Sequence, residues 1–143
     1  MTSILINQLS FDCGYGSSSL RERIYCDCDF PNKRMDGFLI YTASGDSEGT
    51  LGGLVRQGLP GRLETTFARA LNKAAWCSYD PVCIESSGQG PDSCNLAACH
   101  GCAILPETSC EEGNRLLDRA MLIGSPSDQS MGFFSEYLKV AQG

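Results

Sequence analysis

The sequence predicts a small mixed α+β domain with few strands, two or three helices and one long loop rich in cysteine. A length of 143 residues is typical of one domain with a modest core. The hydrophobic content of 42% is that of an ordinary globular protein. Sixteen glycines and nine cysteines indicate an irregular backbone, which small domains commonly fix with a metal ion or disulfides. We therefore expect residues 1–143 to form a single domain.

The clearest helix is expected over residues 63–76, where apolar side chains recur at three- and four-residue steps. We expect Trp76 to close this apolar face against the core. The clearest strand is expected over residues 37–42, a short run of apolar and aromatic side chains. The glycine-rich segment 45–53 contains acidic side chains that would repel phosphate, so we interpret it as a packing turn.

The N-terminal segments are harder to assign. Residues 4–11 are mostly apolar and fit either a helix or a strand. Because this segment starts so near the first residue, we expect it to pack against a missing segment or a partner chain. Ser17 or Ser18 could cap a short helix over residues 20–25.

The C-terminal third is expected to begin a helix at Ser109, because Ser109 and Glu112 have the spacing of a capping box. Gly124 would end this helix, and a short element over residues 133–140 would follow. Residues 78–109 between the two main helices show no sustained periodicity. A structureless loop of this length in a compact domain requires something to hold it.

Charge and targeting signals limit the classes of function. A net charge of −6 with scattered basic residues argues against strong nucleic-acid binding by this chain alone. The N-terminus lacks a secretory signal, and no apolar run is long enough for a membrane span. We therefore expect the reducing cytoplasm and no membrane partner. In that compartment clustered cysteines indicate metal binding or catalysis rather than disulfides.

The cysteines of the long loop predict one structural Zn²⁺ site. Cys99 and Cys102 form a C-x-x-C turn, a spacing that allows two thiolates to occupy adjacent corners of a zinc tetrahedron. We expect Gly101 to supply the positive φ that such a turn often needs. Cys110 would lie in the first turn of the capped helix, where the helix dipole favours a thiolate.

The fourth ligand must come from upstream, from Cys83, Cys94 or Cys77. We favour Cys83, because a ligand there would tie the end of the long helix to the C-x-x-C turn and close the loop. The predicted ligand set is therefore Cys83, Cys99, Cys102 and Cys110, in a zinc subregion spanning residues 77–119. Cys77 is expected to be buried or a near neighbour, and His100 to point away from the metal.

Two other classes of function remain open. Cys83, Glu85 and the C-x-x-C pair are spaced like the ligand, the catalytic glutamate and the distal ligands of zinc deaminases. Four thiolate ligands would leave no position for the water that catalytic zinc requires, so we favour a non-enzymatic role. A direct DNA-binding module is the third possibility.

Three motifs resemble a known family: residues 95–102 (NLAACHGC), 105–111 (LPETSCE) and 114–119 (NRLLDR). They closely resemble the C-terminal region of the DrmB family of the DISARM anti-phage defence system. Residues 42–55, 76–78 and 89–93 resemble the same family. The chain is more distantly similar to the C-terminal four-cysteine domain of MrfA-type DNA-repair helicases.

The resemblance implies a helicase-associated zinc-binding domain. Its partner would be a helicase of the DrmA type or the remainder of a DrmB-like protein, and this chain would engage phage DNA only indirectly. Cys99, Cys102 and Cys110 would take three of the family's ligand positions and Cys83 the fourth.

Overall fold

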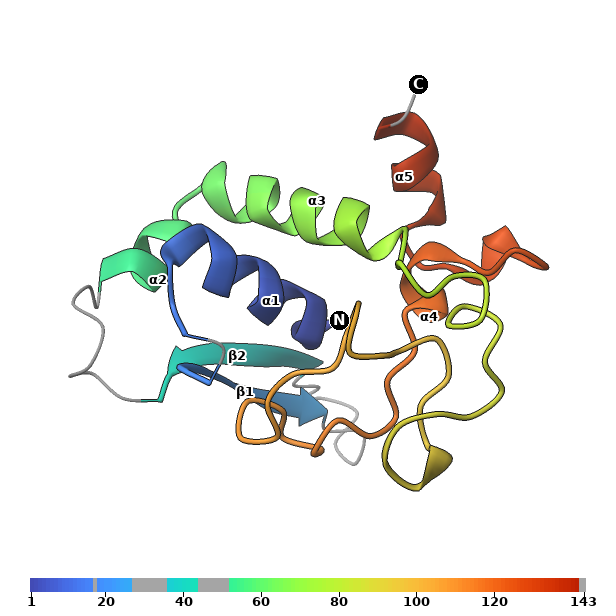
Figure 1. Cartoon of the computed structure of the whole chain (residues 1–143). Coiled ribbons are helices and arrows are strands. Elements are labelled where there is room, and N and C mark those ends of the chain that lie inside the picture. The colour runs from blue at the N-terminus through green and yellow to red at the C-terminus, as the bar shows by residue number, and fades with distance from the viewer. Residues whose placement is uncertain (17, 27–35, 44–51, 142–143) are drawn as a thin grey trace.

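The computed structural model describes residues 1–16, 18–26, 36–43 and 52–141 (Figure 1). Two strands and five α-helices are present in these ranges, with short 3₁₀ turns at Pro91–Ser93 and Gln129–Met131. The elements in chain order are α1 (Thr2–Cys13), β1 (Leu20–Cys26), β2 (Asp36–Thr42), α2 (Gly52–Gln57), α3 (Arg62–Ala74), α4 (Ala120–Ile123) and α5 (Ser135–Ala141). This small mixed architecture is the predicted fold class, although the described ranges contain five α-helices where two or three were expected. None of the helices in the described ranges is long and apolar enough to cross a membrane.

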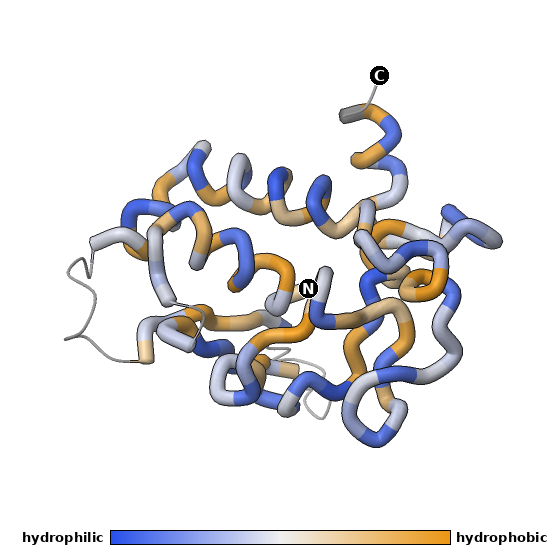
Figure 2. Tube along the Cα trace, viewed as in Figure 1, coloured by the Kyte–Doolittle hydropathy of each residue, from blue (hydrophilic) through white to orange (hydrophobic). Residues whose placement is uncertain are grey.

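The core lies around α1, which runs between α3 and the sheet (Figure 1). α1 buries Ile4, Leu5, Ile6 and Leu9 within the chain. The segment 4–11 is therefore helical, and most of its apolar side chains are covered by α3 and the strands, whereas Phe11 at its end is 79% exposed. Figure 2 shows hydrophobic and hydrophilic residues alternating along α3. The helix expected over residues 63–76 is confirmed as α3, which ends two residues earlier, at Ala74.

The sheet consists of β1 and β2, paired antiparallel from Leu20 opposite Thr42 to Cys26 opposite Asp36. The strand expected over residues 37–42 is thus confirmed. The helix expected over residues 20–25 is wrong. In this segment Leu20 and Glu22 are buried while Arg21 and Arg23 are exposed, an alternation that fits a strand with one covered face.

The outer edge of β1 is paired with a segment almost ninety residues further along the chain. The Glu22 N–H donates to the Ser109 carbonyl at 3.1 Å, and the Ile24 N–H donates to Glu111 Oε2 at 2.6 Å. The capping box predicted at Ser109 is therefore wrong, because this segment satisfies a strand edge and starts no helix. The next helix, α4, begins only at Ala120; it ends before Gly124, as predicted.

Trp76 does not pack on the core. α3 ends at Ala74, and the Trp76 side chain beyond it is 70% exposed. The predicted C-terminal element is present as α5. The glycine-rich segment 45–53 lies mostly outside the described residues, as does Cys28; its last two glycines begin α2.

The irregular loop predicted over residues 78–109 is present and continues to residue 119, and two buried asparagines organise it. Asn95 Nδ2 donates to the Asn114 carbonyl at 2.7 Å, and Asn95 Oδ1 accepts from the Leu117 N–H at 2.9 Å. The Asn114 side chain bonds both main-chain groups of Leu105, at 2.9 and 2.7 Å. These side-chain amides supply hydrogen bonds to main-chain groups that a helix or sheet would otherwise satisfy.

Candidate metal centre

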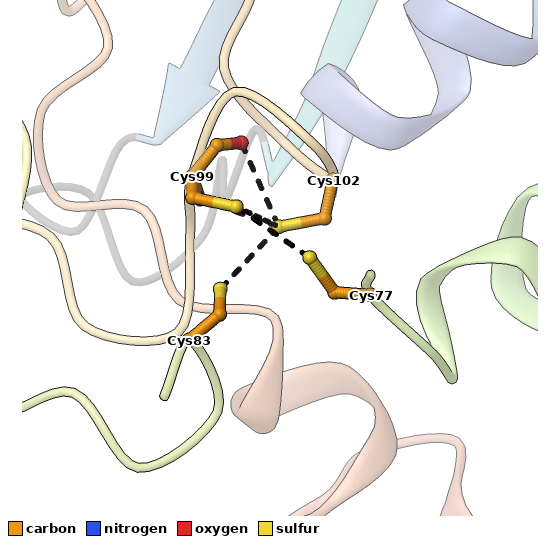
Figure 3. Close-up of side chains that lie close together, drawn as sticks. All are labelled: Cys77, Cys83, Cys99 and Cys102. Carbon is orange, nitrogen blue, oxygen red and sulfur yellow. Dashed lines mark hydrogen bonds between the residues drawn. The ribbon is translucent and has the colours of Figure 1, made fainter. Parts of the chain in front are cut away.

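Four cysteine side chains converge where the end of α3 meets the long loop. They are Cys77, Cys83, Cys99 and Cys102, and their sulfurs all lie within 4.8 Å of one another (Figure 3). The Cys77–Cys99 sulfur distance is 3.5 Å. The Cys83–Cys102 and Cys99–Cys102 distances are both 3.8 Å. Cys77 and Cys83 are buried, and Cys99 and Cys102 are half-buried.

These separations fit a tetrahedral zinc site. A regular tetrahedron with Zn–S bonds of about 2.3 Å has sulfur–sulfur edges of about 3.8 Å. A disulfide would need about 2.05 Å between the sulfurs, so all four thiols are free. The residues present therefore match the ligand type, the ligand number and the spacing that a structural zinc ion requires.

Asp80 shapes the turn that brings Cys77 and Cys83 to the same side. Its Oδ2 accepts a hydrogen bond from the Cys77 N–H at 2.9 Å, and its Oδ1 accepts one from the Ile84 N–H at 3.1 Å. The Cys83 N–H also donates to the Tyr79 carbonyl at 2.9 Å. One carboxylate thus binds the main chain at both ends of the segment that joins the two cysteines.

Main-chain amides point at the sulfurs from both turns. The Tyr79 N–H donates to Cys77 Sγ at 3.5 Å, and the Gly101 N–H donates to Cys99 Sγ at 3.3 Å. The Cys99 N–H donates to Cys102 Sγ at 3.3 Å. Such donors favour the charged form of a sulfur, which is the form that binds a metal.

Gly101 has a different role from the one expected. Its φ lies outside the left-handed region, so the positive φ predicted for this turn is wrong. A Cβ at this position would lie 2.9 Å from two ring carbons of Tyr79. Glycine is therefore required by the close approach of the C-x-x-C turn to the Tyr79 ring on the Cys77 turn.

Arg119 provides a buried positive charge beside the cluster. Its side chain is 1% exposed and donates to the Ala74 carbonyl at 2.9 Å and to Asp80 Oδ1. Burial lowers the pKa of Arg119, but Asp80 and the nearby sulfurs outweigh burial, so its pKa lies above the ordinary value. The guanidinium stays charged and offsets part of the negative charge that thiolates would concentrate here.

The thiols influence one another's ionisation. Burial raises the pKa of Cys83, but hydrogen bonds from neighbouring thiols and Gln89, with the charge of Arg119, bring its pKa below the ordinary value. Burial raises the pKa of Cys99 and of Cys102, and interactions with neighbouring sulfurs also raise both. A divalent cation would relieve this competition, because it stabilises all the thiolates together.

The structure brings together three of the four predicted ligands, Cys83, Cys99 and Cys102, but not Cys110. Cys77 lies in the position predicted for Cys110. Cys110 is buried beside Glu22, and burial, followed by the hydrogen bond and charge of this carboxylate, raises the pKa of its thiol. Without the predicted helix, no helix dipole favours a thiolate there.

The remaining candidates lie outside the cluster. Cys94 is exposed, with its sulfur 3.6 Å from the Asp92 carbonyl, and His100 is exposed as expected. Glu85 is also exposed and belongs to no metal-binding group in the described residues. The spacing Cys77-x5-Cys83 was the signal that could have identified Cys77, since it supplies two sulfurs from one turn.

The fold and the four-sulfur site are those of a small zinc-binding domain. Residues 1–103 match the model of the MrfA Zn-binding domain (MZB), and the chain belongs to this family. All four clustered cysteines fall inside the matched range, and Cys110 falls outside it. Zn²⁺ is therefore the metal that the family and the cysteine geometry both indicate.

The chain is also similar to a protein of a known defence system. The chain is 43% identical over 135 residues to the DISARM protein DrmB of Bacillus paralicheniformis. The alignment covers 94% of this chain and 23% of that protein, so the chain spans less than a quarter of the relative's length. The resemblance to the DrmB and MrfA families that the sequence motifs indicated is confirmed.

Proposed function

We propose that Cys77, Cys83, Cys99 and Cys102 bind one Zn²⁺ ion, and that the chain is a non-enzymatic structural module of a DISARM-like anti-phage defence complex. The observation that carries this proposal is the convergence of four cysteine sulfurs from two turns, all within 4.8 Å of one another and with three sulfur–sulfur distances of 3.5–3.8 Å. The ion would join the turn after α3 to the C-x-x-C turn. It would thereby hold the zinc subregion, residues 77–119, against the rest of a single domain formed by residues 1–143.

A structural role is favoured over a deaminase-type enzyme by the ligand set. Four thiolates complete a tetrahedral shell, and a catalytic zinc ion needs an open position for water. Glu85, the residue spaced like a catalytic glutamate, has an exposed side chain and is not part of the cysteine cluster. The cluster therefore resembles closed zinc sites that stabilise a fold.

The proposed partner is a helicase of the DrmA type or the remainder of a DrmB-like protein, contacted in the cytoplasm. The relative's name supports a place in the DISARM system. The net charge of −6 favours protein contacts over direct DNA contact. Two of the arginines are already ion-paired at the surface, Arg23 with Glu111 and Arg115 with Asp92.

Cobalt substitution tests the zinc site. Co²⁺ bound by four thiolates in place of zinc gives an intense tetrahedral d–d spectrum with sulfur-to-metal charge transfer. The proposal requires this spectrum at one Co²⁺ per chain, with no change when a small anion that would displace bound water is added. A spectrum that responds to such an anion would indicate an open site and favour the enzyme.

Co-purification tests the partner. The chain is co-expressed with a helicase of the DrmA type, with Val55→Glu, at a 75% exposed position on α2, as a control for surface charge. We expect a complex that survives nuclease treatment. The loss of that complex on nuclease treatment, together with DNA binding by the chain alone at low salt, would favour the DNA-binding module.

A further inference from the structure

The outer edge of β2 is open in the part of the chain that the structure describes. In the register of the sheet, the Ala43 N–H bonds the Ser19 carbonyl, so Tyr41, Leu39 and Gly37 also point their main-chain groups at β1. The main-chain N–H and C=O groups of Phe38, Ile40 and Thr42 point away from β1, toward the outer edge. Among the described residues no hydrogen-bond partner is found for these outward groups. β1 differs, because residues 109–111 cover its outer edge.

An apolar groove of about 490 Å³ adjoins this edge. Leu5 is buried at its base, and its sides come from β2, α3 and α5. Three large side chains on the sides remain 42–46% exposed: Leu63, Phe38 and Tyr137. Phe38 belongs to both features, since its main chain lies on the open edge and its ring lines the groove. Exposed apolar surface of this kind commonly marks a binding site.

The two features together specify the chemistry of an occupant. A strand added to β2 would pair with Phe38, Ile40 and Thr42, and every second side chain would point to the face that carries the groove. Those side chains must be apolar. Glu64 is the one charged residue among those lining the groove, and one of its oxygens accepts the Gly61 N–H at 2.6 Å. Its other oxygen can receive a basic side chain.

A second copy of this chain is a poorer occupant. Antiparallel pairing of two β2 strands places the two-fold axis perpendicular to the extended sheet. The helices of both copies would then lie on the same face, where α3 and α5 of each copy would meet. A bare strand brings no such helices and can enter the groove.

We propose that β2 and the adjoining groove bind an extended peptide segment of a protein partner, with apolar residues at alternate positions and a basic residue facing Glu64. This inference relies on the proposed role of the chain as a module that acts through protein contacts, but not on the zinc site. It assigns the contact surface to the side of the domain formed by β2, α3 and α5.

The test uses a phage-displayed library of random twelve-residue peptides, selected on the full zinc-loaded chain. We expect enriched peptides with alternating apolar residues and one basic residue. Thr42→Pro removes one outward N–H without removing a bond to β1, and Leu63→Glu places a charge in the groove. Each should weaken binding of a synthetic enriched peptide at least about tenfold. Val55→Glu, at a 75% exposed position on α2, should leave affinity unchanged.

Two further readouts locate the bound peptide on this surface. Peptide binding should slow amide hydrogen exchange at Phe38 and Ile40 but not at Leu39, which already faces β1. Glu64→Gln should weaken the binding only of those peptides that retain the basic residue. Zinc content is measured for every variant, so that loss of zinc is recognised as failure of the metal site.

Three results would overturn the proposal. The first is no enrichment above background phage. The second is enriched peptides whose affinity is unchanged by both Thr42→Pro and Leu63→Glu. The third is a dimer in sedimentation that Thr42→Pro dissociates, since the edge would then be filled by a second copy.

Discussion

Arg119, which is fully buried, and Asp80, which is partly buried, form an ion pair that connects the Cys77–Cys83 turn to α3. The guanidinium also bonds the carbonyl of Ala74, the last residue of α3, and the carboxylate binds the main chain of the Cys77–Cys83 turn. The pair therefore links the helix end, the turn that carries two cysteines and the segment before α4. Residues that hold metal ligands in place are often as necessary as the ligands themselves.

Replacement of Arg119 by Met should destabilise the domain strongly. The substitution leaves the Asp80 carboxylate without its buried cation, a loss that typically costs about 3 kcal/mol or more. Urea denaturation of the zinc-bound protein measures the change. The control is Arg115→Met, whose exposed pair with Asp92 should contribute less than about 1 kcal/mol. Equal effects of the two substitutions would contradict the role given to Arg119.

Asn114→Asp should destabilise the long loop while preserving its shape. Asn114 donates through Nδ2 to the Leu105 carbonyl at 2.7 Å, and a carboxylate would instead set two acceptors against each other. Leaving such a buried group unsatisfied costs about 1–3 kcal/mol. The same exchange at exposed Asn72 on α3 is the control, and thermal unfolding compares the two. A midpoint for Asn114→Asp as high as that of the control would show that this bond is dispensable.

Removal of zinc should disorder the loop more than the helices. Residues 78–119 contain little regular structure, so the loss should be small in far-ultraviolet circular dichroism. Amide hydrogen exchange at Leu96, Ala103 and Leu117 should become much faster. Trp76 is next to Cys77 and 70% exposed, so its fluorescence should report the change. If the amide exchange rates of the loop were the same before and after chelation, the metal would not be what holds the loop.

The sequence predicts best what depends on local pattern. The periodicity of α3 and the apolar run of β2 are local, and both elements were found where expected. The helix expected over residues 20–25 was wrong because Leu20 and Ile24 have helical spacing, whereas pairing with β2 makes this segment a strand. Ser109 and Glu112 match a capping box, yet the Ser109 carbonyl and the Glu111 side chain bind β1 instead.

In the metal centre too, the part that depends on local pattern was predictable and the part that depends on tertiary contacts was not. The proposed ligands Cys99 and Cys102 were predictable because both residues lie in one local turn. The choice between Cys77 and Cys110 depends on which of them the fold brings near that turn. The capping-box interpretation favoured Cys110, but the tertiary contacts of Arg119 and Asp80 with the end of α3 bring Cys77 to the cluster.

The most direct test of the four-cysteine site is the zinc affinity of Cys77→Ser compared with that of Cys110→Ser, measured by competition with a chromophoric chelator. Loss of a true ligand should exceed the effect of losing an outer-shell partner, so Cys77→Ser should weaken zinc binding by about 100-fold or more. Cys110→Ser should bind one zinc per chain with unchanged affinity. If Cys110→Ser instead lost zinc and Cys77→Ser kept it, the assignment of Cys77 as a ligand would be contradicted.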